Sequence, residues 1–251
     1  MARLLVTGGT GYLGSELLRR RPDAVGVSTR DFDVRDAEAV QRALHEHRPD
    51  AVVHTAYRQG TPDEWSVNVD GSEAVAAAAA AAGVRLVHMS SDLVFGGARG
   101  GCREDDPPDP VTDYGRSKAE AERCVAAAHP AALLVRTSLI YGGPEPGKHE
   151  LAAVDAANTF FTDELRSPVQ VGDLAAALLE ALETELAGPL HLGGADVVSR
   201  CEFARLLARR EVRCALSTDL GLVRPLDCTL DSSRARSLLR TRLRGVREVL
   251  A

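Results

Sequence analysis

The stretch Val6–Gly14, VTGGTGYLG, decides the fold of this 251-residue chain. It continues the short apolar run Arg3–Thr7 and opens a segment over Tyr12–Arg20 that is typical of a helix. Its glycines have the spacing G-x-x-G-x-x-G, which between a strand and a helix indicates a dinucleotide-binding loop. Gly8 allows the tight turn, Gly11 lets the backbone approach a pyrophosphate, and the third glycine permits close helix–strand packing. We predict such a loop; the alternative is a glycine turn that binds no dinucleotide.

The following residues repeat this alternation of short apolar runs and helical stretches. Apolar runs cover residues 24–29, 50–56, 84–91 and 132–138, and helical stretches cover 36–47, 65–82 and a segment that starts at Tyr114. Short apolar runs between helices are typical of a parallel sheet that is covered on both faces. The predicted fold class is therefore α/β, with a Rossmann-like doubly wound parallel sheet.

The regular alternation stops after Tyr141. Residues 169–183 still predict one strand and one helix, whereas GPLHLGG (188–194) and the remainder predict smaller pieces. We expect an NAD(P)-binding Rossmann domain over 1–143 with 166–187. A small C-terminal substrate-binding cap is expected over 144–165 with 188–251. Such a cap covers the carboxyl ends of the strands, where ligands bind in open α/β sheets.

Composition and charge exclude several kinds of partner. A net charge of −6 and a pI near 5.7 give no electrostatic reason to expect nucleic acid or an anionic membrane. No apolar run approaches the length of a membrane span, and the first residues do not resemble a signal peptide. We expect a cytoplasmic protein, monomeric or homodimeric, with a small-molecule substrate. Its five cysteines lack paired spacing and are expected to be reduced: Cys102, Cys124, Cys201, Cys214 and Cys228.

A tyrosine and a lysine four residues apart form the predicted catalytic pair. Only two of the 30 basic residues are lysines, and Lys118 follows Tyr114 at the start of a helix, so both face the same way. A neighbouring ammonium is expected to lower the pKa of a phenol, which is ordinarily about 10. Ser91 ends the strand 84–91 and is expected to steady a carbonyl oxygen of the substrate. The alternative is a solvated helix with an exposed Tyr and Lys.

The end of the second strand is expected to select the cofactor. An acidic residue there would hold the ribose of NADH, but this strand ends with Ser28 and Arg30, and guanidinium pairs well with a 2′-phosphate. We therefore predict NADPH, with NADH possible. The predicted cofactor-binding residues are Gly8, Thr10, Gly11, Tyr12, Leu13, Gly14, Ser28, Arg30, Asp33, Val34, Thr55, Ala56, Tyr57, Ser90, Tyr114 and Lys118.

Further polar residues follow the predicted strands. The four tyrosines all fall just beyond a strand or at the start of the next helix; Tyr114 is the predicted acid and the others are predicted pocket walls. The predicted substrate-binding residues are Ser91, Asp92, Tyr141 and Arg224. For Arg136, contact with substrate and a structural ion pair are equally supported. Scattered histidines such as His54 and His88 are expected in the core or in solvent, with no metal site.

The motifs together resemble the extended short-chain dehydrogenase/reductase family. TGGTGYLG, SSDLVF and YGRSK carry this resemblance, and VRTSLIYG, RSPVQVGDLA and RPLDCTLDSSRA are similar to its dTDP-4-dehydrorhamnose reductase-like branch. The resemblance implies a Ser–Tyr–Lys triad, at Ser91, Tyr114 and Lys118, and a sugar nucleotide 4-ketone as substrate. The segments 57–71 and 147–168 are shorter than in that branch. Leu93 stands where sugar-nucleotide 4,6-dehydratases have an acid, which disfavours dehydration.

We therefore expect an NADPH-dependent reductase of a nucleotide-linked 4-keto-6-deoxy sugar in deoxysugar biosynthesis. Tyr114 would protonate the carbonyl oxygen, Lys118 would lower the pKa of Tyr114, and Ser91 would position the carbonyl. Two alternatives stay open. One is a reductase of a non-sugar ketone, which the smaller cap would suit. The other is a non-catalytic NAD(P)-binding regulatory subunit, because a fold does not fix a function.

Overall fold

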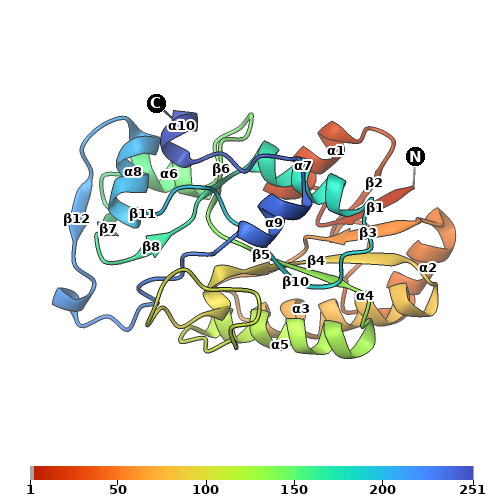
Figure 1. Ribbon diagram of the computed structural model, residues 1–251. Coiled ribbons are helices and arrows are strands. Elements are labelled where there is room, and N and C mark those ends of the chain that lie inside the picture. The colour runs from red at the N-terminus through yellow and green to blue at the C-terminus, as the bar shows by residue number, and fades with distance from the viewer. Residues whose placement is uncertain (1–2, 251) are drawn as a thin grey trace.

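A six-stranded parallel sheet forms the centre of the molecule in the computed structural model, which describes residues 3–250 (Figure 1). The strand order is β10-β5-β4-β3-β1-β2, so the order reverses at β1, between β2 and β3. In open α/β sheets such a reversal marks the crevice where ligands bind. The strands are β1 (Leu4–Thr7), β2 (Val25–Val27), β3 (Ala51–His54), β4 (Arg85–Ser91), β5 (Leu133–Thr137) and β10 (Gly188–Leu192).

Helices cover both faces of this sheet. Leu4 and Val6 of β1 face one side and Leu5 faces the other, and all three are at most 3% exposed. This double burial explains why the strands are continuously apolar. One face packs against α1 (Tyr12–Arg20), α7 (Val171–Ala181) and α9 (Ser233–Leu238). The other packs against α2 (Ala37–His47), α4 (Asp70–Ala81) and α5 (Asp113–Ala128).

The cap elements gather at one end of the sheet, on the left of Figure 1. Two small two-stranded pairings hold them: β11 with β8, antiparallel, and β12 with β7, parallel. The cap consists of α6 (Lys148–Val154), β7 (Thr159–Phe161), β8 (Leu165–Arg166), β11 (Val198–Ser199), α8 (Arg200–Ala208), β12 (Arg213–Ala215), η2 (Thr218–Leu220) and α10 (Val246–Leu250). Short elements complete the junction with the sheet: α3 (Glu64–Asn68), η1 (Asp92–Val94), β6 (Ile140–Tyr141) and β9 (Val169–Gln170).

Two sequence-based predictions need correction, one about the domain division and one about a helix. The strand β10 is not part of the cap, because it pairs with β5 along the edge of the central sheet, and α9 packs on the same core. The predicted helix over 65–82 is two helices, since α3 ends at Asn68 and α4 starts at Asp70. The outermost predicted domain residues, 1, 2 and 251, lie outside the described part of the chain.

The expectation that all five cysteines are reduced is also wrong. Cys201 on α8 and Cys214 on β12 form a disulfide, with their Cα atoms 5.7 Å apart. The fold brings these two cap elements together, and a spacing of 13 residues gave no sign of that pairing. The other three cysteines are buried free thiols. Between residues 3 and 250, no helix is long and apolar enough to cross a membrane.

Candidate active site

The glycine loop forms a tight turn at the end of β1. Gly8 has a φ of +70°, and the Gly11 amide donates to the Gly8 carbonyl oxygen at 2.8 Å. A Cβ atom at Gly14 would collide with the same oxygen, so α1 can approach the turn only with glycine at this position. Gly11 precedes the first helical residue, Tyr12, and has no side chain to cap the helix. The first-turn amides are therefore open to an anion such as a pyrophosphate.

A cleft extends from this loop along the carboxyl ends of the strands. It comprises a catalytic cavity of about 1160 Å³, which contains Tyr114 and Lys118, and a β2 cavity of about 480 Å³ around the end of β2. Together the two cavities offer a continuous elongated site that fits a dinucleotide and a second ligand. The residues that line both cavities form the waist of the cleft: Gly11, Tyr12, Thr55, Tyr57, Gln59, Thr61 and Lys148.

Most residues that the sequence predicts for the cofactor and substrate line this cleft. In the catalytic cavity are Gly11, Tyr12, Leu13, Gly14, Thr55, Tyr57, Ser90, Ser91, Asp92, Tyr114, Lys118 and Arg224. In the β2 cavity alone are Gly8, Thr10, Ser28, Asp33, Val34 and Ala56. The strand ends therefore bring the predicted residues together, while their contacts with ligands stay predictions.

Two predicted site residues lie away from the cleft. Tyr141 is fully buried, with its ring 5.4 Å from that of Phe203, so it is a core residue and not a pocket wall. Arg30 is exposed and lines neither cavity, because β2 ends early at Val27 and a turn follows. Arg35, five residues further on, lines the β2 cavity and forms an ion pair with Asp33. Arg35 therefore replaces Arg30 as the candidate for a 2′-phosphate.

Ser91, Tyr114 and Lys118 meet at the wall of the catalytic cavity. Ser91 is the last residue of β4, and α5 begins at Asp113 with Thr112 as its cap, whose hydroxyl accepts from the Gly115 amide at 3.0 Å. This cap fixes the first turn of α5 and hence the position of Tyr114. Lys118 lies one turn further on and is only 3% exposed.

The charges of this group differ from the expectation in one respect. Burial raises the pKa of Tyr114 well above its ordinary value; Tyr57 and Asp92 raise it further, and a hydrogen bond with Ser91 opposes the rise. The net shift is therefore upward, opposite to the predicted lowering, because burial has the largest effect. Lys118 donates to the carbonyl oxygen of Met89 at 2.6 Å, and burial lowers its own pKa to about 8. At neutral pH both side chains hold their protons.

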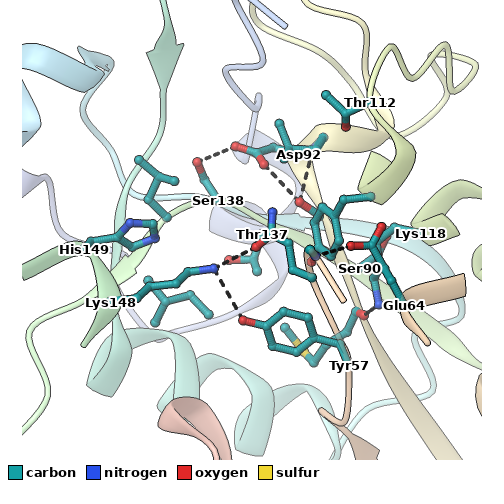
Figure 2. Close-up of a pocket in the computed structure, with 18 of the residues that line it drawn as sticks. Tyr57, Glu64, Ser90, Asp92, Thr112, Lys118, Thr137, Ser138, Lys148 and His149 are labelled. Carbon is teal, nitrogen blue, oxygen red and sulfur yellow. Dashed lines mark hydrogen bonds between the residues drawn. The ribbon is translucent and has the colours of Figure 1, made fainter. Parts of the chain in front are cut away.

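Asp92 links the catalytic group to the cap. Its buried carboxylate accepts from Ser138 Oγ at 2.6 Å and from Ser91 Oγ at 3.1 Å, and Figure 2 shows Ser138 pointing at it. The Arg166 guanidinium lies 3.7 Å away, from Nε to Oδ2. Burial raises the pKa of Asp92, while Arg166 and Ser138 oppose this rise. Asp92 thus fixes the hydroxyl of Ser91 at the cavity wall.

The cap side of the catalytic cavity is rich in arginine. Arg224 donates to Glu164 at 2.6 Å through Nε, and Arg166 lies 3.8 Å from the same carboxylate. Arg200 begins α8 and also lines the cavity, and its guanidinium has no hydrogen bond or ion pair within residues 3–250. The cap thus presents more positive than negative groups to a ligand.

Sequence reasoning missed several residues that line the cleft. They are Arg35, Gln59, Glu64, Trp65, Ser138, Lys148, His149, Glu164, Arg166 and Arg200. Most lie in the two shortened segments or in the cap, where no periodic pattern assigns them to a strand end. One signal was available: Lys148 is the second of only two lysines in the chain. Arg136, by contrast, forms a buried ion pair with Glu122. Of the two alternatives for Arg136, this supports the structural ion pair over contact with substrate.

The histidines mostly serve the core. His54 and His88 are 1% exposed, and burial lowers the pKa of His54 to about 3 and that of His88 well below its ordinary range. No group of three or more His, Cys, Asp or Glu side chains in the described chain is arranged to hold a metal ion.

A glycine loop after the first strand, a parallel sheet and a Ser–Tyr–Lys group at one rim define a protein of the extended short-chain dehydrogenase/reductase type. A family model described as the RmlD substrate binding domain matches residues 2–250. The chain belongs to this family, which confirms the resemblance seen in its motifs.

Relatives agree with this assignment. A dTDP-4-dehydrorhamnose reductase of Mycobacterium tuberculosis is 35% identical over 81% of this chain and 73% of its own length. Methionine adenosyltransferase 2 subunit beta of Pongo abelii is 29% identical over 94% of this chain and 82% of its own. The crystal structure of dTDP-4-dehydrorhamnose reductase from Bacillus anthracis in complex with NADP superposes with a TM-score of 0.89. It has 25% identity and covers 99% of this chain and 97% of that chain.

Proposed function

We propose that this protein is an NADPH-dependent reductase of a nucleotide-linked 4-keto-6-deoxy sugar, such as a dTDP-4-keto sugar, in deoxysugar biosynthesis. The observation that carries the proposal is the meeting of Ser91, Tyr114 and Lys118 in a cavity that continues into the glycine-loop cleft. The reductase relatives and the NADP complex of a structural neighbour support the reaction and the cofactor. NADPH would supply the hydride when bound, held by the α1 amides and the β2 cavity.

The chain's own residues supply the proton and the polar contacts. Reduction of a ketone consumes one proton, and the Tyr114 phenol holds one at neutral pH because burial raises its pKa. The Ser91 hydroxyl donates to Asp92 in this structure and would turn its one proton to the same carbonyl oxygen when the substrate binds. Lys118 contributes a buried positive charge beside the developing alkoxide.

The arginines of the cap suit the nucleotide part of the substrate. Arg224 forms an ion pair with Glu164, whereas Arg200 lines the cavity without a side-chain hydrogen bond or ion pair in the described residues. Guanidinium binds phosphate oxygens in a bidentate manner, so Arg200 and Arg224 are the proposed diphosphate contacts. A non-sugar ketone without phosphate would leave these charges unused.

Arg35→Ala is expected to weaken NADPH binding about tenfold and to change NADH binding little. Arg35 lines the β2 cavity, and a guanidinium–phosphate contact contributes only with the cofactor that has a 2′-phosphate. Dissociation constants for both cofactors, from fluorescence titration, provide the measurement. Arg30→Ala serves as the matched control and should bind both cofactors normally. A loss of NADPH preference in the Arg30 variant alone would contradict this assignment.

The pH dependence of kcat/KM is expected to fall on the alkaline side with an apparent pKa near 8. Lys118 carries its charge below its lowered pKa of about 8 and loses it as the pH rises through that value. Tyr114 keeps its proton over the same range, so the decline belongs to Lys118. In Lys118→Arg the charge persists to high pH, and the alkaline decline should disappear even if the rate is lower. An unchanged decline in that variant would exclude Lys118 as its source.

The direct test follows NADPH oxidation with a panel of nucleotide-linked 4-keto-6-deoxy sugars and, beside it, simple ketones without a nucleotide. Turnover with a nucleotide sugar alone supports the proposal. Turnover with simple ketones alone would replace it with a reductase of non-sugar ketones.

A non-catalytic subunit is the second candidate, and the likeness to methionine adenosyltransferase 2 subunit beta favours it. Tight NADPH binding without turnover of any ketone would support this candidate. An intact Ser–Tyr–Lys group beside an open cavity favours the reductase.

A further inference from the structure

Residues 142–150 form a segment, here named the bridge segment, that is hydrogen-bonded to the first residue of α1. The Gly143 amide donates to the Tyr12 hydroxyl at 2.6 Å, and that hydroxyl donates to Glu150 Oε1 at 3.2 Å. The backbone also lies close to the tyrosine ring, because a Cβ atom at Gly143 or Gly147 would come to 2.9 Å from ring atoms. The bridge segment is thus seated on the residue that opens the glycine-loop helix.

The other side of the bridge segment reaches the opposite rim of the cleft through Lys148. Its Nζ donates to Gln59 Oε1 at 3.0 Å and lies 3.5 Å from the Tyr57 hydroxyl and 5.7 Å from the centre of that ring. Figure 2 shows the side chain extended toward Tyr57. Tyr57 and Gln59 follow β3, whereas Tyr12 follows β1, so the bridge segment spans the two rims.

Lys148 lies at the waist of the cleft, where a pyrophosphate is expected. It lines both cavities together with Gly11 and Tyr12, which stand at the N-terminus of α1. The helix N-terminus attracts an anion from one side of the waist. Lys148 lies at the same waist.

Charge pairing singles out Lys148 among the cations that line the β2 cavity. Arg35 is paired with Asp33, and Arg58 lies 3.8 Å from a carboxylate oxygen of Asp63. The contacts of Lys148, in the described chain, are the neutral amide oxygen and phenol of the opposite rim. An ammonium with only neutral partners can transfer to a phosphate oxygen without breaking an ion pair.

We propose that Lys148 binds the pyrophosphate of the dinucleotide from the side opposite α1. On cofactor binding, the ammonium exchanges its neutral partners, Gln59 and Tyr57, for phosphate oxygens. This inference rests on the dinucleotide-binding part of the proposed function and does not depend on the ketone that is reduced.

The test measures binding by calorimetry with Lys148→Gln, Lys148→Arg and the control Arg42→Gln. Arg42 is an exposed cation on α2 outside the cleft, so its substitution removes the same charge at a remote place. The probes are NADPH and adenosine 2′-phosphate, which lacks the pyrophosphate. We expect Lys148→Gln to raise the Kd for NADPH about tenfold and to reduce its salt dependence. Lys148→Arg should restore binding largely, and adenosine 2′-phosphate should bind all variants alike.

Three results would overturn the inference. They are an unchanged Kd for NADPH in Lys148→Gln, an equal loss for adenosine 2′-phosphate, and an equal loss in Arg42→Gln. None of them involves a keto sugar. A protein that shows the expected binding changes but reduces no keto sugar would therefore retain the Lys148 contact and lose only the proposed reaction.

Discussion

Tyr114→Phe is expected to lower kcat for ketone reduction by about 10²- to 10⁴-fold, the usual contribution of a positioned proton donor. The substitution removes one hydroxyl and keeps the ring that packs edge-on against Tyr57, with centroids 6.1 Å apart. The glycine loop and the waist of the cleft are unaffected, so the Kd for NADPH should stay within about twofold. Steady-state kinetics with the accepted substrate and a separate binding titration measure the two effects.

Tyr57→Phe is the matched control for this prediction. It removes a hydroxyl from the same cavity, but Tyr57 is 42% exposed and its hydroxyl contacts Lys148 instead of Ser91. Its effect on kcat should be less than about tenfold, because a contact at the rim does not transfer the proton. Wild-type kcat in Tyr114→Phe, or equal losses in the two variants, would remove Tyr114 from the role of proton donor.

Local sequence signals predicted the parts of the fold that depend on neighbouring residues. The bounds of α1 were predicted because the glycine spacing and the helical pattern are both contained in Val6–Arg20. The strand β10 was misassigned to the cap because its partner in the sheet, β5, lies 55 residues earlier. The pairing of Cys201 with Cys214 likewise depends on how α8 packs beside β12. Long-range pairing of this kind leaves no periodic trace in a sequence.

The same distinction between local sequence signals and long-range packing applies to the site. Residues at strand ends, such as Ser91 and Asp92, could be placed because parallel strands present their carboxyl ends at one edge. Arg200 and Lys148 could not be placed, because no comparable rule gives the positions of residues in the cap segments. The sign of the pKa shift of Tyr114 also escaped prediction. It depends on burial, which sequence spacing does not give, whereas the lysine four residues away was visible.

Glu122→Gln is expected to lower the free energy of unfolding by about 3–5 kcal/mol, the usual cost of removing one partner from a buried ion pair. Arg136 on β5 donates to Glu122 on α5 through Nε at 3.0 Å and Nη2 at 2.8 Å, and the two side chains are only 3% and 6% exposed. Loss of the carboxylate charge leaves the guanidinium beside the Phe95 ring, 5.1 Å away, without its counter-ion. Urea unfolding measures the difference.

Glu120→Gln separates burial from charge, because Glu120 lies on the same helix and pairs with the exposed Arg123 at 2.6 Å. That variant should lose less than about 1 kcal/mol, as expected for a surface ion pair. The double variant Glu122→Leu with Arg136→Met should cost less than Glu122→Gln alone, since it leaves no buried charge unpaired. If Glu122→Gln were as mild as Glu120→Gln, the pair would not stabilise the contact between α5 and β5. Tyr114 and Lys118 lie on the same helix as Glu122. The ion pair therefore also affects the position of these catalytic side chains.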